Sequence, residues 1–151
     1  MDRGTLRVRL SGADAHYGQN LVSMARIIEL MADAGTELEI MDCGDEGLLA
    51  CWKHIEQYVP VFAGDYVEVK SWFSRYGNTS RDMEAEVYKV CESADGGKTT
   101  ACNLIDPPIL VAKGSAVGVS PKDLDRGLQV KTREEIPFIP NDGKNWWENN
   151  K

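Results

Sequence analysis

The chain has 151 residues, 42% of them hydrophobic and 27% charged, and a formal net charge of −7. This length fits one domain that buries a sizeable core, and the acidic balance disfavours a nucleic-acid partner, because phosphate binding depends on clustered Lys and Arg. No apolar run approaches the roughly 20 residues of a membrane-spanning helix, and residues 1–10 lack the apolar centre of a signal peptide. We therefore expect a cytoplasmic domain without a membrane segment.

The earliest elements along the chain are a strand and a helix. Residues 5–10, TLRVRL, alternate apolar and basic side chains, which is typical of a half-buried strand. From residue 20 to residue 34, apolar side chains recur at helical spacing and form a stripe wide enough for a buried helix. Asn20 suits the N-cap of this helix, and Gly35 suits its C-terminal end.

Five further segments read as strands, separated by turn signals such as Gly-Asp and Asp-Gly-Gly. One long helix followed by a largely antiparallel sheet predicts an α+β fold over residues 1–130. Residues 131–151 are rich in Pro, Asn and charge and predict a C-terminal tail, with Ile136, Phe138, Trp146 and Trp147 as anchors. The five strand segments are residues 38–43, 48–60, 65–77, 80–92 and 108–120.

The four cysteines show no zinc-type spacing. No two of them form a C-x-x-C pair. We therefore interpret Cys43, Cys51, Cys91 and Cys102 as free thiols that serve mostly as small hydrophobic residues. The sequence predicts no metal site.

Four motifs resemble one family. They are DAHYGQNLVSMARI (14–27), DAGTEL (33–38), VPVFAGDYVEV (59–69) and YGNTSRDMEAEVYKV (76–90). The chain resembles, from about Leu6 to Val119, the hotdog-fold ammonia lyases that act on 3-aminobutyryl-CoA and β-alanyl-CoA, and the 3-aminobutyryl-CoA enzymes of lysine fermentation are the nearer match. The resemblance implies a hotdog dimer with sites between subunits, commonly assembled into hexamers, and a substrate that brings its own coenzyme A without another cofactor.

The first motif combines polar side chains with the start of the predicted helix. Ammonia elimination from a β-aminoacyl thioester needs a base, a hold for the amine and donors for the enolate-like oxygen. With Asn20 as the cap, the backbone N–H groups of Leu21, Val22 and Ser23 would be free to serve as those donors. Asp14 and His16 are candidates for acid–base work or for anchoring ammonium, and the alternatives are a turn residue and a structural histidine.

Two acids near the predicted C-terminal end of the helix are further candidates. Asp33 falls in the predicted last turn, where a carboxylate meets the negative end of the helix dipole, and this unfavourable place hints at function. Glu37 follows the predicted helix and could take the α-proton or hold the substrate ammonium, and the alternative is a solvent-facing strand residue. Glu39 is expected to face solvent by strand alternation.

The segment SRYGNTSRD forms a basic, hydrogen-bonding turn in an acidic chain. Such a turn could bind the phosphates of coenzyme A, although a hairpin with exposed arginines is the simpler interpretation. Two other functions fit the same residues: a hotdog thioesterase, and a silent acyl-CoA-binding domain. The candidate CoA-binding residues are Arg75, Gly77, Asn78, Thr79, Ser80, Arg81 and Lys113.

Overall fold

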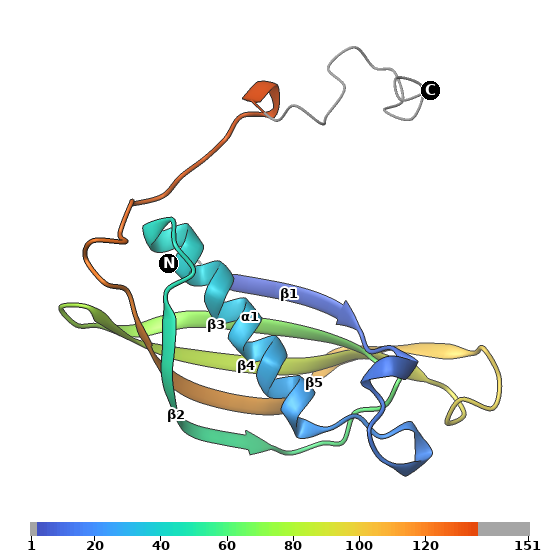
Figure 1. Cartoon of the computed structure of the whole chain (residues 1–151). Coiled ribbons are helices and arrows are strands. Elements are labelled where there is room, and N and C mark those ends of the chain that lie inside the picture. Colours follow the sequence, from blue (N-terminus) through green and yellow to red (C-terminus); the bar gives the residue numbers. More distant parts are fainter. Residues whose placement is uncertain (1–2, 136–151) are drawn as a thin grey trace.

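The computed structural model describes residues 3–135 and shows one long helix lying across a five-stranded antiparallel sheet (Figure 1). The strand order in the sheet is β1-β3-β4-β5-β2, so β1 and β2 form its two edges. The predicted α+β fold with a single helix is confirmed. The elements are β1 Gly4–Arg9, α1 Met24–Cys43, β2 Leu48–Gln57, β3 Tyr66–Tyr76, β4 Ser80–Ser93 and β5 Cys102–Val119, with short 3₁₀ turns at Gly12–Asp14, Gly18–Asn20 and Arg133–Glu135.

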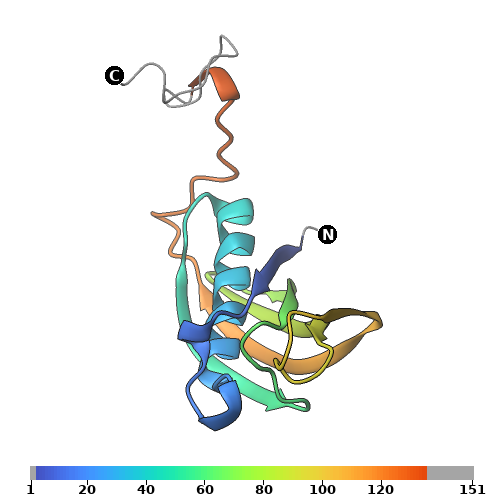
Figure 2. The same ribbon diagram turned by 90° about the vertical axis from the view of Figure 1, so that its right-hand side faces the viewer.

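The helix covers one face of the sheet (Figure 2). Strands β3 and β4 alternate buried and less buried side chains residue by residue, as strands with one covered face do. The side chains on the covered face meet the apolar stripe of α1 and exclude water, which stabilises the fold. The main core consists of Leu10, Val22, Ile27, Leu30, Met31, Ala34, Val61, Val67, Val69, Ala85, Val87, Val111 and Ala112.

Both predicted helix ends are wrong. The N-cap is Ser23, whose side chain accepts a hydrogen bond from the N–H of Ala25 (3.1 Å), and the helix ends at Gly44, which has a left-handed backbone (φ 68°). Gly35 lies inside the helix, and residues 38–43, predicted as a strand, form its last turns. Met24, expected to be buried, is 36% exposed.

Two glycines explain how closely the helix approaches the sheet. A Cβ atom on Gly35 would collide with the sulfur of Met83 on β4, and a Cβ atom on Gly4 would collide with the carbonyl oxygen of Ala34. The hydroxyl of Ser71 donates a buried hydrogen bond to the same Ala34 oxygen (2.8 Å). Gly35 therefore serves packing, and this role takes precedence over its tendency to end helices.

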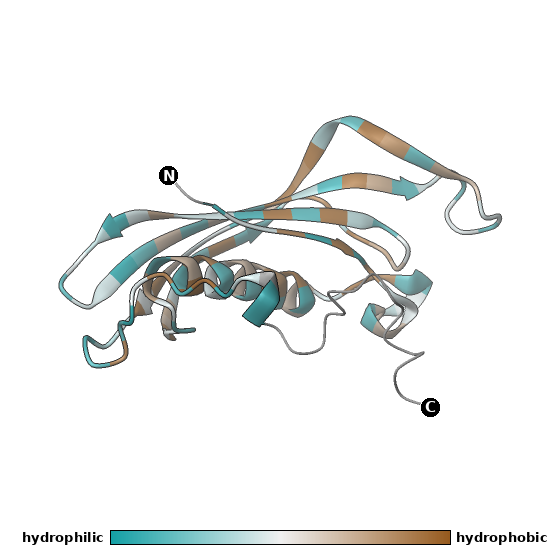
Figure 3. Cartoon of the chain, turned by 90° about the horizontal axis from the view of Figure 1, so that it is seen from above, coloured by the Kyte–Doolittle hydropathy of each residue, from teal (hydrophilic) through white to brown (hydrophobic). Residues whose placement is uncertain are grey.

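The opposite face of the sheet carries alternating charges. Figure 3 shows α1 on one side of the strands and bands of polar and apolar residues along them.

No helix in the described part of the chain is long and apolar enough to cross a bilayer. The predicted anchors at Ile136, Phe138, Trp146 and Trp147 lie outside the described residues. Ion pairs on the open face join Arg7 and Lys70 to Glu68, Lys53 and Arg75 to Asp82, and Lys113 to Glu86.

Candidate functional site

The loop before α1 does not present the donors that the sequence suggested. The N–H of Leu21 donates to Gly18 O (3.2 Å), and the N–H of Val22 donates to Val61 O (3.0 Å). Asn20 has a left-handed backbone (φ 61°), and its carbonyl accepts from Ala63 (2.9 Å). The prediction of Asn20 as the cap, with free N–H groups at Leu21 and Val22, is wrong because α1 begins three residues later.

The true N-terminal end of α1 opens onto a groove of about 360 Å³. Ser23 satisfies two groups of the first turn: its side chain accepts from Ala25, and its carbonyl accepts from Arg26 (3.0 Å). Among residues 3–135, the N–H of Met24 has no such partner, so it is free to donate at the positive end of the helix dipole. The groove is lined by Tyr17, Leu21, Val22, Ser23, Met24, Gln57, Tyr58, Val59 and Pro60.

Asp14 lies beside this helix end. Its carboxylate accepts from the N–H of Ser11 (2.7 Å) and forms an ion pair with Arg26 on the first turn of α1 (2.9 Å). The side chain thus stabilises the 3₁₀ turn at Gly12–Asp14 and ties it to the helix. His16 is exposed, and its ring meets the Tyr17 ring edge-on, with 4.6 Å between centroids.

The other two candidate acids lie in the middle of α1. Asp33 is exposed and sits ten residues before the C-terminal residue of the helix, so the argument from the dipole end does not apply to it. Glu37 is half-buried on α1, where its carboxylate accepts a hydrogen bond from the N–H of Thr5 (2.7 Å). Glu37 follows Arg26, the partner of Asp14, by eleven positions, about 16 Å along the helix axis at about 1.5 Å per residue. One chain therefore keeps Asp14 and Glu37 apart.

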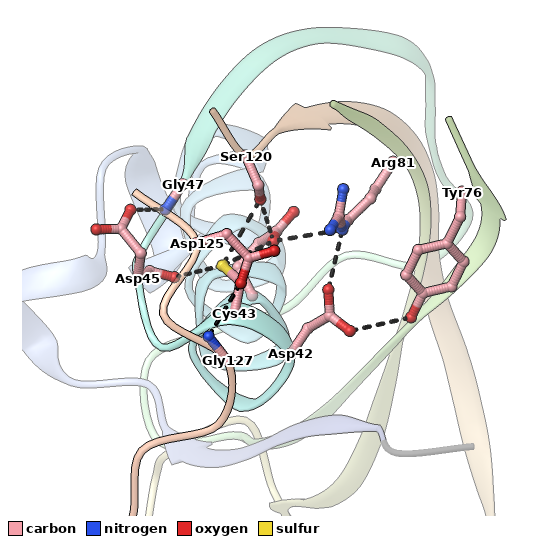
Figure 4. Close-up of polar contacts among 10 residues, drawn as sticks. Asp42, Cys43, Asp45, Gly47, Tyr76, Arg81, Ser120, Asp125 and Gly127 are labelled. Carbon is pink, nitrogen blue, oxygen red and sulfur yellow. Dashed lines mark hydrogen bonds and ion pairs between the residues drawn. The ribbon is translucent and has the colours of Figure 1, made fainter. Parts of the chain in front are cut away.

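A buried polar cluster at the C-terminal end of α1 was missed by sequence reasoning (Figure 4). Glu39 is only 5% exposed, and its Oε2 accepts a hydrogen bond from the Ser120 hydroxyl (2.7 Å). Arg81 of β4 donates from Nε to Asp42 (3.0 Å) and lies 3.9 Å from Glu39 Oε2. The Cys43 thiol lies 3.7 Å from the same Glu39 oxygen. Glu39 was expected to face solvent because a strand was predicted, whereas the helix turns it inward.

Glu39 also lines a small cavity between α1, β2 and the ends of the central strands. The cavity measures about 50 Å³. Its wall is mainly apolar, and the other Glu39 oxygen, Oε1, is buried without a hydrogen-bond partner in the described chain. The lining residues are Ala32, Gly35, Thr36, Glu39, Glu46, Leu48, Leu49, Phe73, Met83 and Gly118.

The predicted basic turn is split between the two faces of the sheet. Arg81 is buried on the helix face, whereas Arg75 is exposed and binds Asp82 on the open face (2.8 Å). Asp82 is also paired with Lys53, and these two cations hold the pKa of its carboxyl at about 2. The two arginines therefore do not form one cationic pocket.

The remaining candidates of this region shape the hairpin or the open face. Gly77 donates to Ser80 O (2.7 Å) and closes the turn between β3 and β4, while Thr79 O accepts from Ser120 (2.8 Å). Asn78 is exposed. Lys113 pairs with Glu86 (3.0 Å) across the open face, and this contact raises the pKa of Lys113.

The cysteines occupy separate places. Cys43 is buried in the polar cluster and Cys51 is exposed on β2, while Cys91 and Cys102 share a cleft at the far end of β4 and β5. Burial, followed by the neighbouring Cys102 thiol, raises the pKa of Cys91. Within residues 3–135, no group of three or more His, Cys, Asp or Glu side chains is placed to hold a metal ion.

The fold and the groove at the helix end define a hotdog-fold protein. The chain is 34% identical to β-alanyl-CoA:ammonia lyase from Clostridium propionicum, with a TM-score of 0.82 over 85% of this chain and 92% of that one. A hexameric hotdog-fold thioesterase of Campylobacter jejuni shares the fold at 20% identity, with a TM-score of 0.63 over 83% of this chain and 88% of that one. No protein-family profile matches the chain.

A curated relative narrows the class. The chain is 44% identical to the 3-aminobutyryl-CoA ammonia lyase of Acetoanaerobium sticklandii over 82% of its own length and 98% of that protein. The chain belongs to the hotdog-fold ammonia lyases of 3-aminobutyryl-CoA and β-alanyl-CoA. The resemblance found in its sequence motifs is confirmed.

Proposed function

We propose that this protein is an ammonia lyase that eliminates ammonia from 3-aminobutyryl-CoA to give crotonyl-CoA, and that it catalyses the reverse addition. The observation that carries this proposal is the 44% identity to a 3-aminobutyryl-CoA ammonia lyase across 98% of that protein. The acyl-CoA thioester and ammonia are thus the proposed partners, and the reaction needs no cofactor beyond the CoA of the substrate.

The groove at the N-terminal end of α1 supports a place for the thioester. The free N–H of Met24 points out of the positive end of a helix, where an oxygen that gains negative charge during α-proton removal is stabilised. Leu21, Val59 and Pro60 give the groove an apolar side for the acyl chain. The N–H of Met24 therefore takes the role of oxyanion donor that the sequence analysis assigned to the N–H groups of Leu21 and Val22.

The candidate carboxylates have different roles in the proposed reaction. Glu37 removes the α-proton and the electrons of the broken C–H bond form the new double bond. The C–N bond of the protonated amine breaks, its electron pair stays on nitrogen, and neutral ammonia leaves. Only Oε2 of Glu37 is used by Thr5 in the described chain, which leaves Oε1 for the proton. His16 and Asp14 hold the departing amine near the groove, and Asp14 would exchange its ion pair with Arg26 for the amine. Asp33, exposed on α1, is the alternative base.

A second copy of the chain is needed to complete such a site. Arg26, which binds Asp14, and Glu37 are separated by about 16 Å along α1, so Asp14 and Glu37 of one chain lie too far apart for one small acyl group. Strand β2 is an unpaired edge of the sheet and carries Leu48 (62% exposed) and Leu49 (48% exposed). Exposed apolar edge strands favour pairing with another chain. We therefore propose a dimer joined at β2 that assembles further, to a hexamer.

For the phosphates of CoA, the exposed cations Arg75 and Lys113 remain the proposed contacts, together with the hairpin turn at 77–80. Each would have to exchange a carboxylate for a phosphate, since Arg75 is bound to Asp82 and Lys113 to Glu86. Arg81 is excluded from this role by its burial against Asp42.

The test is to incubate the purified protein with crotonyl-CoA and ammonium at alkaline pH and to follow the absorbance of the enoyl thioester. The absorbance should fall only when protein and ammonium are both present. A parallel assay with a thiol reagent measures free CoA. Release of CoA from crotonyl-CoA without ammonium dependence would identify a thioesterase, and no change in either assay would identify a silent acyl-CoA-binding domain.

A further inference from the structure

The cavity beside Glu39 lies apart from the groove at the N-terminal end of α1 and has no role in the mechanism above. It presents a carboxylate oxygen, Oε1 of Glu39, that is buried and has no hydrogen-bond partner in the described chain. A buried unpaired acceptor costs roughly 1–3 kcal/mol and more when it is charged. Such an atom therefore indicates that a donor is missing from the cavity.

The lack of a side chain at Gly118 keeps this oxygen accessible. A Cβ atom at Gly118 would lie 3.0 Å from Glu39 Oε1. The glycine on β5 therefore leaves open the space next to the free oxygen. Gly35 also lines the cavity, but the space at its Cβ position is filled by the sulfur of Met83.

The size of the cavity limits its occupant. Its volume of about 50 Å³ holds only a few water-sized particles, because a cavity needs about 10–15 Å³ of this kind for one water. An acyl chain or a nucleotide does not fit. Ammonium is of the same size as water.

The charge around the cavity favours a cation. Arg81 is bonded to the half-buried Asp42 and lies near the other oxygen of Glu39, so one cation faces two carboxylates and the group of Glu39, Asp42 and Arg81 carries one excess negative charge. Glu46, an exposed acid, also lines the cavity. Buried charges are stabilised by pairing, and a monovalent cation would balance this one.

The acceptors suit ammonium. The hydroxyl of Thr36 donates to Ala32 O (3.0 Å), so its oxygen remains an acceptor on the cavity wall next to Glu39. We propose that this cavity binds ammonium, with Glu39 Oε1 and Thr36 Oγ1 as acceptors. The inference rests on the proposed function, in which ammonium is a substrate or product of the enzyme.

The test is thermal unfolding of the full chain, without any CoA compound, in increasing ammonium chloride, potassium chloride or tetramethylammonium chloride at matched ionic strength. Ligand binding to the folded state raises the unfolding midpoint in proportion to the logarithm of its concentration. Ammonium should raise the midpoint above that in tetramethylammonium, which is too large for the cavity. An equal rise in potassium would overturn the assignment to ammonium, and equal midpoints in all three salts would overturn the site.

Three variants locate the effect. Glu39→Gln removes the charge, and Gly118→Ala places a methyl group against Oε1, so both should abolish the ammonium-specific rise. Glu29→Gln, an exposed position on the same helix, should keep it. If Gly118→Ala folds and retains the full rise, the cavity is not the binding site. Because this measurement uses no thioester, a negative result would overturn the ammonium site without bearing on the proposed lyase activity.

Discussion

Arg81 and Asp42 form a hydrogen-bonded ion pair at the C-terminal end of α1, with 3.0 Å between Nε and Oδ2. Glu39 lies behind this pair, so Arg81 is the cation that faces two carboxylates. Replacing Arg81 by Ala leaves these charges unbalanced, and loss of one partner of a buried pair typically costs about 3 kcal/mol. We expect a marked fall in the free energy of unfolding, measured in urea.

Arg75, from the same hairpin, is the control for this prediction. Its pair with Asp82 lies on the exposed face, and exposed pairs contribute little. Arg75→Ala should lower the urea midpoint much less than Arg81→Ala does. Equal midpoints for the two variants would contradict the assignment of Arg81 to the protein interior.

Gly4 determines how closely β1 approaches the helix. A methyl group at Gly4 would collide with the backbone oxygen of Ala34, which cannot move aside without shifting α1. We expect Gly4→Ala to destabilise the fold by about 1–3 kcal/mol, as overpacking does. Gly12→Ala is the matched control, because nothing lies within 4 Å of its added methyl group. Circular dichroism during urea unfolding measures both variants, and equal stability would show that β1 is free to move.

Glu37→Gln tests the proposed base. Glutamine keeps an oxygen that accepts from the N–H of Thr5, so the fold should survive, while general-base function is lost. We expect kcat for ammonia elimination to fall by about 10²–10⁴-fold with acyl-CoA binding retained. Asp33→Asn, on the same helix, should have the smaller effect. Near-normal turnover in Glu37→Gln, together with loss of turnover in Asp33→Asn or Asp14→Asn, would move the base to one of those acids.

The pKa of Asp82 predicts a pH dependence of stability. Arg75 and Lys53 hold this pKa at about 2 in the folded protein, below the ordinary value of 3.8. A lowered carboxyl pKa adds stability above pH 3.8 that is lost as the pH falls towards 2. The difference in urea midpoint between the wild type and Asp82→Asn should therefore be constant near neutral pH and shrink below about pH 4. A difference that persists undiminished to about pH 2 would contradict the ion pairs.

Leu49→Glu tests the proposed β2 interface. A charge on this exposed edge strand should oppose pairing of two sheets. The molar mass of the variant, measured by light scattering after gel filtration, should therefore be lower than that of the wild type. Leu124→Glu, also on the exposed surface, should leave the mass unchanged. A monomeric wild type, or an unchanged mass for Leu49→Glu, would remove β2 from the assembly.

The sequence was sufficient for the fold class because its period-two and helical patterns are long and regular. The helix ends failed for a local reason. Asn20 and Gly35 have the chemistry of caps, but Ser23 takes the capping role and Gly35 is required where α1 touches Met83. Residues 38–43 alternate briefly like a strand, and so short an apolar run does not distinguish a strand from a buried helix turn.

The site was harder to predict than the fold because it depends on the direction in which each side chain points. A strand would have placed Glu39 in solvent, and the helix instead buries it against Ser120, which is 81 positions away along the chain. The strand alternation also places Arg75 and Arg81 on opposite faces of the sheet, which their spacing alone did not show. The sequence identified Asp14, Asp33 and Glu37 as candidate acids. It did not show that Asp14 and Glu37 lie far apart, because this separation follows from the length of α1.

Reversible addition of ammonia to an enoyl thioester is the activity proposed for this protein. The most direct measurement is mass spectrometry of the product formed from crotonyl-CoA with ordinary and with ¹⁵N-labelled ammonium. An ammonia lyase should give a thioester whose mass equals crotonyl-CoA plus one ammonia and rises by one mass unit with the label. Free CoA, or crotonyl-CoA plus one water with no response to the label, would contradict it.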